Sequence, residues 1–71
     1  MKKFLIIIES TDSGYSAYVP DLPGCVATGN TKAQVEQNIY EAIQFHLEGM
    51  KEEGLEIPEP CTEGETLLIA V

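Results

Sequence analysis

The sequence predicts an α+β domain in which one long helix covers one face of a small sheet. Short apolar runs stand near both ends of the chain, at residues 4–8 and 66–71. Between them, apolar residues recur at helical spacing, and clusters of Gly, Pro, Ser and Asp separate the segments. With 71 residues, the chain has room for one hydrophobic core, so we expect a single domain over residues 1–71.

The first three strands are expected to form an antiparallel meander. Residues 3–9 contain a continuous apolar run rich in β-branched side chains, which is typical of a strand covered on both faces. The turn cluster STDSG at 10–14 predicts a hairpin to a second strand at 15–19. Residues 25–28 follow as a short third strand, which ends before Gly29.

The stretch YVPDLPGC links the second and third strands. Pro20 has no N–H to donate to a sheet, so the second strand should end there. Pro23 and Gly24 suit the two central positions of a type II turn, because proline sets φ at the first and glycine accepts a positive φ at the second. We therefore interpret these three residues as structural.

One helix is expected over residues 32–53. Thr31 followed by Gln34 matches a capping box, and Gly54 is placed to end the helix in a left-handed conformation. A broad apolar stripe should face the sheet; it consists of Val35, Ile39, Ala42, Ile43, His46, Leu47 and Met50.

The run at 66–71 predicts a fourth strand. Because it reaches the sheet by way of the helix, it can lie parallel to the first strand through a right-handed crossover. The result is a β-β-β-α-β domain with a mixed four-stranded sheet of order 3-2-1-4 and the helix on one face.

Composition restricts the partners. The chain has twelve acidic and four basic residues, a formal charge of -8 and no arginine, which argues against direct binding to nucleic acid. A basic protein partner fits better, although the charge could also serve solubility alone. The apolar run near the N-terminus is too short for a signal peptide or a membrane span. We expect a cytoplasmic protein without membrane contact.

No catalytic set emerges from the spacing. His46 lies in the apolar stripe, where a lone imidazole is more often structural than catalytic. The sheet order is similar to that of the ribonuclease H core, but a two-metal nuclease needs carboxylates on the first and fourth strands. Only Glu9, at the end of the first strand, qualifies. Cys25 and Cys61 read as reduced thiols. We therefore expect no enzyme activity, metal or cofactor.

The opposite face of the helix is polar and acidic. Its side chains fall in one narrow stripe that consists of Gln37, Glu41, Gln44, Glu48 and Glu52. Like charges at i and i+4, as at Glu48 and Glu52, destabilise a helix by about 0.2–0.5 kcal/mol. A cationic partner would relieve that repulsion; an ordinary solvated face is the alternative.

The stretch GYSAYVPDLPGCVATGNTKAQVEQNIYEAIQFHLEGMKEEGLEIPEP resembles the HicB-like antitoxin family. The shared pattern is G-x-x-A-x-V-P-D-L-P-G-C, then G-x-T, a helix with an E-A-I segment, and G-x-x-I-P-x-P. The resemblance implies a partly degenerate ribonuclease H-like fold without nuclease activity. It also implies a partner, a HicA-like toxin, which is a small basic ribonuclease that the antitoxin neutralises by covering its active site.

From this resemblance we expect the toxin contact to include Asp21, Glu41, Glu48 and Glu52. Many family members continue into a DNA-binding domain, whereas this sequence stops at Val71, which makes direct operator binding doubtful. A homodimer or homotetramer is expected, because so small a core gains from association. The alternative is an orphan homo-oligomeric domain of the same fold, which binds a small ligand or serves as a structural subunit.

Overall fold

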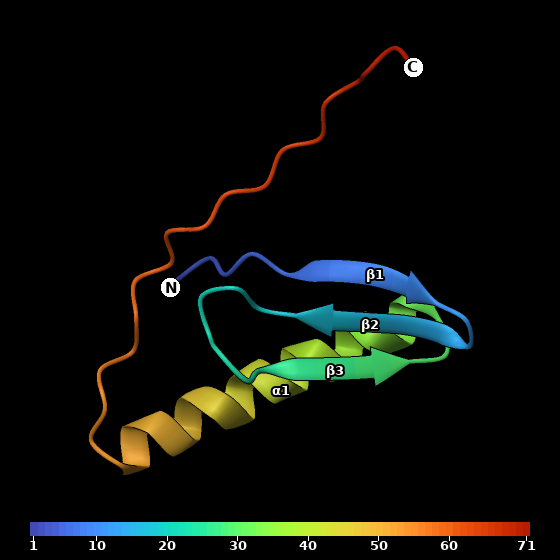
Figure 1. The fold of residues 1–71 in the computed structure, drawn as a ribbon. Coiled ribbons are helices and arrows are strands. Elements are labelled where there is room, and N and C mark those ends of the chain that lie inside the picture. The colour runs from blue at the N-terminus through green and yellow to red at the C-terminus, as the bar shows by residue number, and fades with distance from the viewer.

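A three-stranded antiparallel sheet lies against one helix in the computed structural model, which describes residues 1–71 (Figure 1). The strands are β1 (Ile7–Thr11), β2 (Gly14–Tyr18) and β3 (Val26–Gly29), in the order β1-β2-β3. β1 begins four residues later than the sequence predicts, because its first residue, Ile7, pairs with the last residue of β2, Tyr18. Beyond Tyr18 the chain turns away, and residues 3–6 have no strand to pair with.

The corner between β2 and β3 consists of two consecutive turns. Leu22 N–H donates to Val19 C=O at 3.0 Å, and Cys25 N–H donates to Leu22 C=O at 3.0 Å. Gly24 has φ of 85°, the positive value that a type II turn requires at its third position. Between the two turns, the side chain of Leu22 is 1% exposed. The corner therefore reverses the direction of the chain, and its Leu22 side chain closes one end of the core.

The helix α1 spans Lys32–Glu52. Thr31 caps it, since its Oγ1 accepts from Gln34 N–H at 3.0 Å. The second half of the expected capping box is not formed, because the Gln34 side chain donates to Asn38 Oδ1 instead. Gly54, with φ of 73°, ends the helix. The α1 helix is not apolar enough to cross a membrane, and the chain has no other helix.

The C-terminal end of α1 is a Schellman motif. Leu55 N–H donates to Met50 C=O at 2.9 Å, and Gly54 N–H donates to Lys51 C=O at 3.1 Å. These are the two hydrogen bonds that define the motif. They fix the direction in which the chain leaves the helix.

The core lies between α1 and one face of the sheet. Six residues are fully buried: Ala17, Val19, Leu22, Cys25, Val35 and Ile39. Half-buried side chains surround them, among them Phe4, Ile6 and Ile8 from the N-terminal segment. At Gly29 the strand β3 passes so close to the start of α1 that a Cβ there would lie 2.6 Å from Val35 N.

The predicted fourth strand is not formed, and the order 3-2-1-4 is therefore wrong for this structure. Residues 55–71 are extended without secondary structure (Figure 1). The segment passes the N-terminal residues and then leaves the body. The physical reason lies in the sequence of 66–71, which is apolar on both faces of a strand, whereas α1 covers only one face of the sheet. The ribonuclease H-like relationship, which rests on that strand, stays a prediction.

Candidate interaction face on the helix

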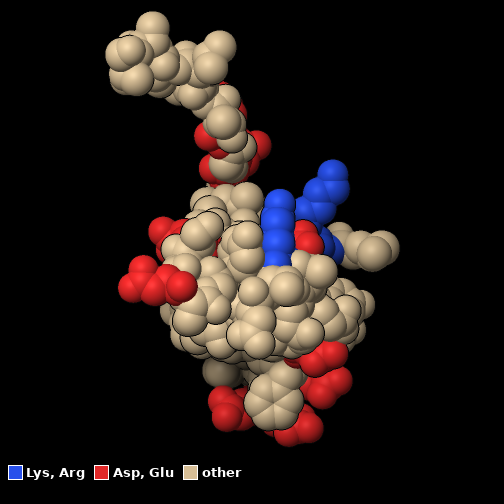
Figure 2. Space-filling view, turned by 90° about the vertical axis from the view of Figure 1, so that its right-hand side faces the viewer, with Lys and Arg blue, Asp and Glu red and all other residues tan.

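The outward face of α1 is acidic and has no cationic partner. Glu41, Glu48 and Glu52 are all exposed. Gln37 Nε2 donates to Glu41 Oε2 at 2.8 Å, but the only ion pair in the chain joins Lys2 to Glu59. Figure 2 shows acidic side chains gathered along the lower edge of the body, where α1 lies, and basic side chains above them. Lys51, in the last turn of α1, makes no ion pair. This face carries negative charge that the chain itself does not neutralise.

An aromatic side chain stands within this acidic face. Phe45 is 81% exposed, and at about 100° per residue it shares the stripe of Glu41, Glu48 and Glu52. Tyr40 flanks the same face, is 57% exposed, and accepts a hydrogen bond from Gln44 at 3.3 Å. Exposed aromatics that are ringed by polar groups are typical of interface anchors.

Phe45 was not predicted from the sequence, because only charged side chains were considered on the outward face of the helix and only apolar ones on the face toward the sheet. The signal was present: an aromatic residue falls on the polar side of an amphipathic helix, four residues after one glutamate and three before another. Phe45 also borders a shallow hollow of about 390 Å³ at the C-terminal end of α1. His46, Gly49, Met50, Glu53 and Leu55 line the rest of that hollow.

Asp21 lies elsewhere, in the corner between β2 and β3, and its carboxylate faces the C-terminal segment. Its Oδ2 accepts from the backbone N–H groups of Cys61 and Thr62, each at 3.1 Å. Its Oδ1 accepts from Thr62 Oγ1 at 2.7 Å and from Cys61 Sγ at 3.4 Å. The structure therefore groups the three helix glutamates and separates Asp21 from them.

These hydrogen bonds set the charge states at the corner. Donation from the Thr62 hydroxyl and then from its backbone N–H lowers the pKa of Asp21. The same carboxylate raises the pKa of the Cys61 thiol, while burial raises the pKa of Cys25. Both cysteines are free, and both raised values disfavour the thiolate form that nucleophilic chemistry needs.

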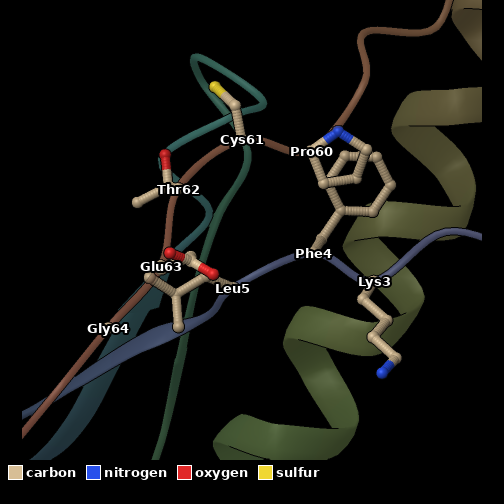
Figure 3. Close-up of a pocket in the computed structure, with 8 residues that line it drawn as sticks. All are labelled: Lys3, Phe4, Leu5, Pro60, Cys61, Thr62, Glu63 and Gly64. Carbon is tan, nitrogen blue, oxygen red and sulfur yellow. The ribbon is translucent and has the colours of Figure 1, made fainter.

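A second hollow, of about 580 Å³, separates the N-terminal residues from the C-terminal segment (Figure 3). Lys3, Phe4 and Leu5 line one side, and residues 60–64 line the other. Lys3 and Glu63 are its only charged residues. No group of three or more His, Cys, Asp or Glu side chains in the structure is placed to hold a metal ion.

A family model described as the HicB_like antitoxin of a bacterial toxin-antitoxin system matches residues 4–68. The chain belongs to the HicB-like antitoxin family. Among solved structures, a chain of a "HicA3 and HicB3 toxin-antitoxin complex" superposes with a TM-score of 0.71 and 35% identity, covering 86% of this chain and 72% of that one. The crystal structure of antitoxin HicB3 superposes with a TM-score of 0.68 and 38% identity, covering 82% of this chain and 43% of that one.

Two sequence relatives of this HicB-like chain differ in length. An uncharacterized 14.9 kDa protein of Haemophilus phage HP1 is 47% identical over 53 residues, which make up 75% of this chain and 40% of the phage protein. A UPF0150 protein of Thermoplasma acidophilum is 40% identical over 63 residues, which make up 89% of this chain and 91% of that protein. This chain thus spans less than half of the phage relative and nearly all of the archaeal one.

Proposed function

We propose that this chain is an antitoxin that binds a small basic HicA-like toxin in the cytoplasm and covers its active site, so that the toxin no longer cleaves mRNA. The observation that carries the proposal is the match, at 35% identity and a TM-score of 0.71, to a chain of a toxin-antitoxin complex. The uncompensated acidic face of α1 supports it, because such a face complements a basic partner. The role is binding, without catalysis or a cofactor.

Glu41, Glu48 and Glu52 surround Phe45 in the proposed contact. The glutamates attract the basic toxin over a range of about one Debye length, 8 Å at physiological salt, and thereby raise the association rate. Phe45 then supplies apolar area that is buried on docking. Asp21, whose carboxylate is engaged by Cys61 and Thr62, acts on the C-terminal segment of its own chain.

Charge reversal tests the acidic face. A double variant, Glu48→Lys with Glu52→Lys, should weaken binding to a HicA-like toxin by about tenfold or more at low salt, and by less at high salt. The helix itself should persist, since lysines near its C-terminal end interact favourably with the helix dipole. Titration calorimetry at two salt concentrations measures both effects.

The matched control changes the net charge by the same amount on the β1–β2 hairpin. Glu9→Lys with Asp12→Lys replaces two exposed acids that lie outside the proposed contact. This control should lose little affinity. Equal losses in both double variants would show that only overall charge matters, and an unchanged affinity in the helix variant would remove this face from the interface.

A second candidate function is that of a homo-oligomeric domain of the same fold, acting as a ligand-binding or structural subunit. The observation that favours it is apolar exposure away from the acidic face: Leu67, Leu68, Ile69 and Val71 are each 65% exposed or more. A homo-oligomer that binds no HicA-like toxin in the calorimetric titration would favour this candidate.

A further inference from the structure

The hollow at the C-terminal end of α1 has a glycine in its middle. Gly49 lies four residues after Phe45 and four residues before Glu53, so the three residues follow one another along the same side of the helix. The rest of the lining consists of His46, Met50 and Leu55. The hollow therefore has an aromatic ring one turn before the glycine and a carboxylate one turn after it.

Nothing within the chain requires a glycine at this position. The two glycines with positive φ are Gly24 and Gly54, so Gly49 has a backbone that any residue can adopt. A Cβ at Gly49 would meet no atom within 4 Å, whereas a Cβ at Gly29 would lie 2.6 Å from Val35 N. Because a glycine inside a helix is less favourable than an alanine, the chain loses helix stability here without gaining a contact of its own. The open space above Gly49 is therefore available to another molecule.

The lining of the hollow combines apolar surface with one unpaired negative charge. Phe45 is 81% exposed and Leu55 is 53% exposed, so both can bury apolar atoms of a ligand. Glu53 is the only acidic residue of the lining, is exposed and makes no ion pair. The C-terminal end of a helix also carries a partial negative charge, which favours a cation. The ligand that fits has a long apolar stem and a cationic end.

We propose that this hollow receives an arginine side chain of the basic toxin, with its methylene stem against Phe45 and its guanidinium group at Glu53. A guanidinium group is more weakly hydrated than the ammonium group of lysine and can donate two parallel hydrogen bonds to one carboxylate. This chain contains no arginine, so a second copy cannot supply the side chain. The identity of the partner rests on the proposed function, whereas the preference for arginine can be tested without a toxin.

Filling the hollow separates stability from binding. Gly49→Leu should raise the melting temperature of the free chain, because leucine is a better helix former than glycine. The same variant should weaken binding to a HicA-like toxin, measured by titration calorimetry, by about tenfold or more, because its side chain occupies the space of the arginine. An unchanged affinity, or a lower melting temperature, would overturn the proposal.

The matched control is Ala33→Leu, which adds a leucine at an exposed position of the first turn of α1. At 1.5 Å of rise per residue, this position lies about 24 Å from Gly49 along the helix. The control should bind the toxin as the wild type does. A loss of affinity equal to that of Gly49→Leu would show that any added apolar side chain on α1 disturbs binding, and it would overturn the proposal.

Nuclear magnetic resonance of the free chain tests the class of ligand without a toxin. The labelled chain is titrated with N-acetyl-arginine amide and, as a neutral control of the same shape, with N-acetyl-citrulline amide. The arginine compound should shift the Gly49 amide and Phe45 ring signals, the citrulline compound should shift them less, and Gly49→Leu should abolish the difference at Phe45. Equal shifts from both compounds, or no shift at Gly49, would overturn the proposal, and larger shifts from N-acetyl-lysine amide would replace arginine by lysine.

The two experiments fail separately. If no HicA-like toxin binds the wild type, the proposed function is wrong, and the comparison of arginine with citrulline still decides whether the hollow prefers a cation. If a toxin binds the wild type and Gly49→Leu equally well, the arginine site is wrong, and the proposed function stands.

Discussion

Truncation of Phe45 to alanine should weaken toxin binding without weakening the fold. Full burial of a phenylalanine side chain contributes about 1.5–3 kcal/mol, and Phe45 is 81% exposed in the free chain. Scaled by that fraction, the loss on Phe45→Ala is about 1.2–2.4 kcal/mol, or roughly 8-fold to 60-fold in Kd. The free energy of unfolding should change by less than about 0.5 kcal/mol, as is usual for exposed positions.

Calorimetric titration of a HicA-like toxin with the wild type and with Phe45→Ala measures this loss, and thermal unfolding checks the fold. Val26→Ala is the matched control, because Val26 is apolar and 65% exposed but lies on the sheet face away from α1. Because Phe45 acts through apolar area, its loss should be nearly independent of salt, unlike that of the charge reversals. Equal Kd values for wild type and Phe45→Ala would refute the assignment of this residue as an anchor.

Three further predictions concern the fold and the corner. Ile39→Ala, at a residue that is fully buried, should lower the free energy of unfolding by about 2–5 kcal/mol, which urea denaturation measures; a loss below 1 kcal/mol would contradict the core described. Gly29→Ala should also destabilise, because its Cβ would lie 2.6 Å from Val35 N, and an unchanged melting temperature would show that this approach is looser. The pKa of Asp21 is lowered in the folded chain. The ionised carboxylate therefore stabilises the C-terminal segment fully above the unfolded pKa of about 3.9, and this stabilisation is lost as the pH falls through the lower pKa of the folded chain. The NMR amide shifts of Thr62 should follow that titration in the wild type and should lose it in Asp21→Asn.

The turns and helix ends that depend on a few neighbouring residues were predicted from the local sequence. The cap at Thr31, the turn at Pro23 and Gly24 and the helix end at Gly54 each depend on residues within a few positions of one another. The helix stripe followed from periodicity, and its first two members, Val35 and Ile39, are the most deeply buried residues of the chain. Strand ends shifted by one to four residues, because pairing depends on where the neighbouring strand stops.

The prediction of a fourth strand was wrong, because the pairing of a strand depends on contacts beyond its local sequence. A two-sided apolar segment can pair with the nearest edge only if something covers its second face, and the sequence of one chain does not say whether a partner provides that cover. The resemblance to the HicB-like antitoxin family predicted both the family and the class of function. The acidic stripe by itself predicted neither, because the same charge also fits a role in solubility alone.

The charges of the candidate site were predicted, and its aromatic residue was missed. Glu41, Glu48 and Glu52 follow directly from helical spacing, and the same spacing places Phe45 among them. Asp21 was grouped with them because it is the charged residue of a distinctive corner. Its hydrogen bonds to residues forty positions later could not be read from the sequence.

The most direct test of the central claim is an RNA cleavage assay with a purified HicA-like toxin. Increasing amounts of the chain are added to a fixed amount of toxin, and the rate of RNA cleavage is measured. The account predicts that cleavage stops when the chain reaches a stoichiometric ratio to the toxin, and that the Glu48→Lys, Glu52→Lys variant requires a large excess. Undiminished cleavage in the presence of excess wild-type chain would contradict the account.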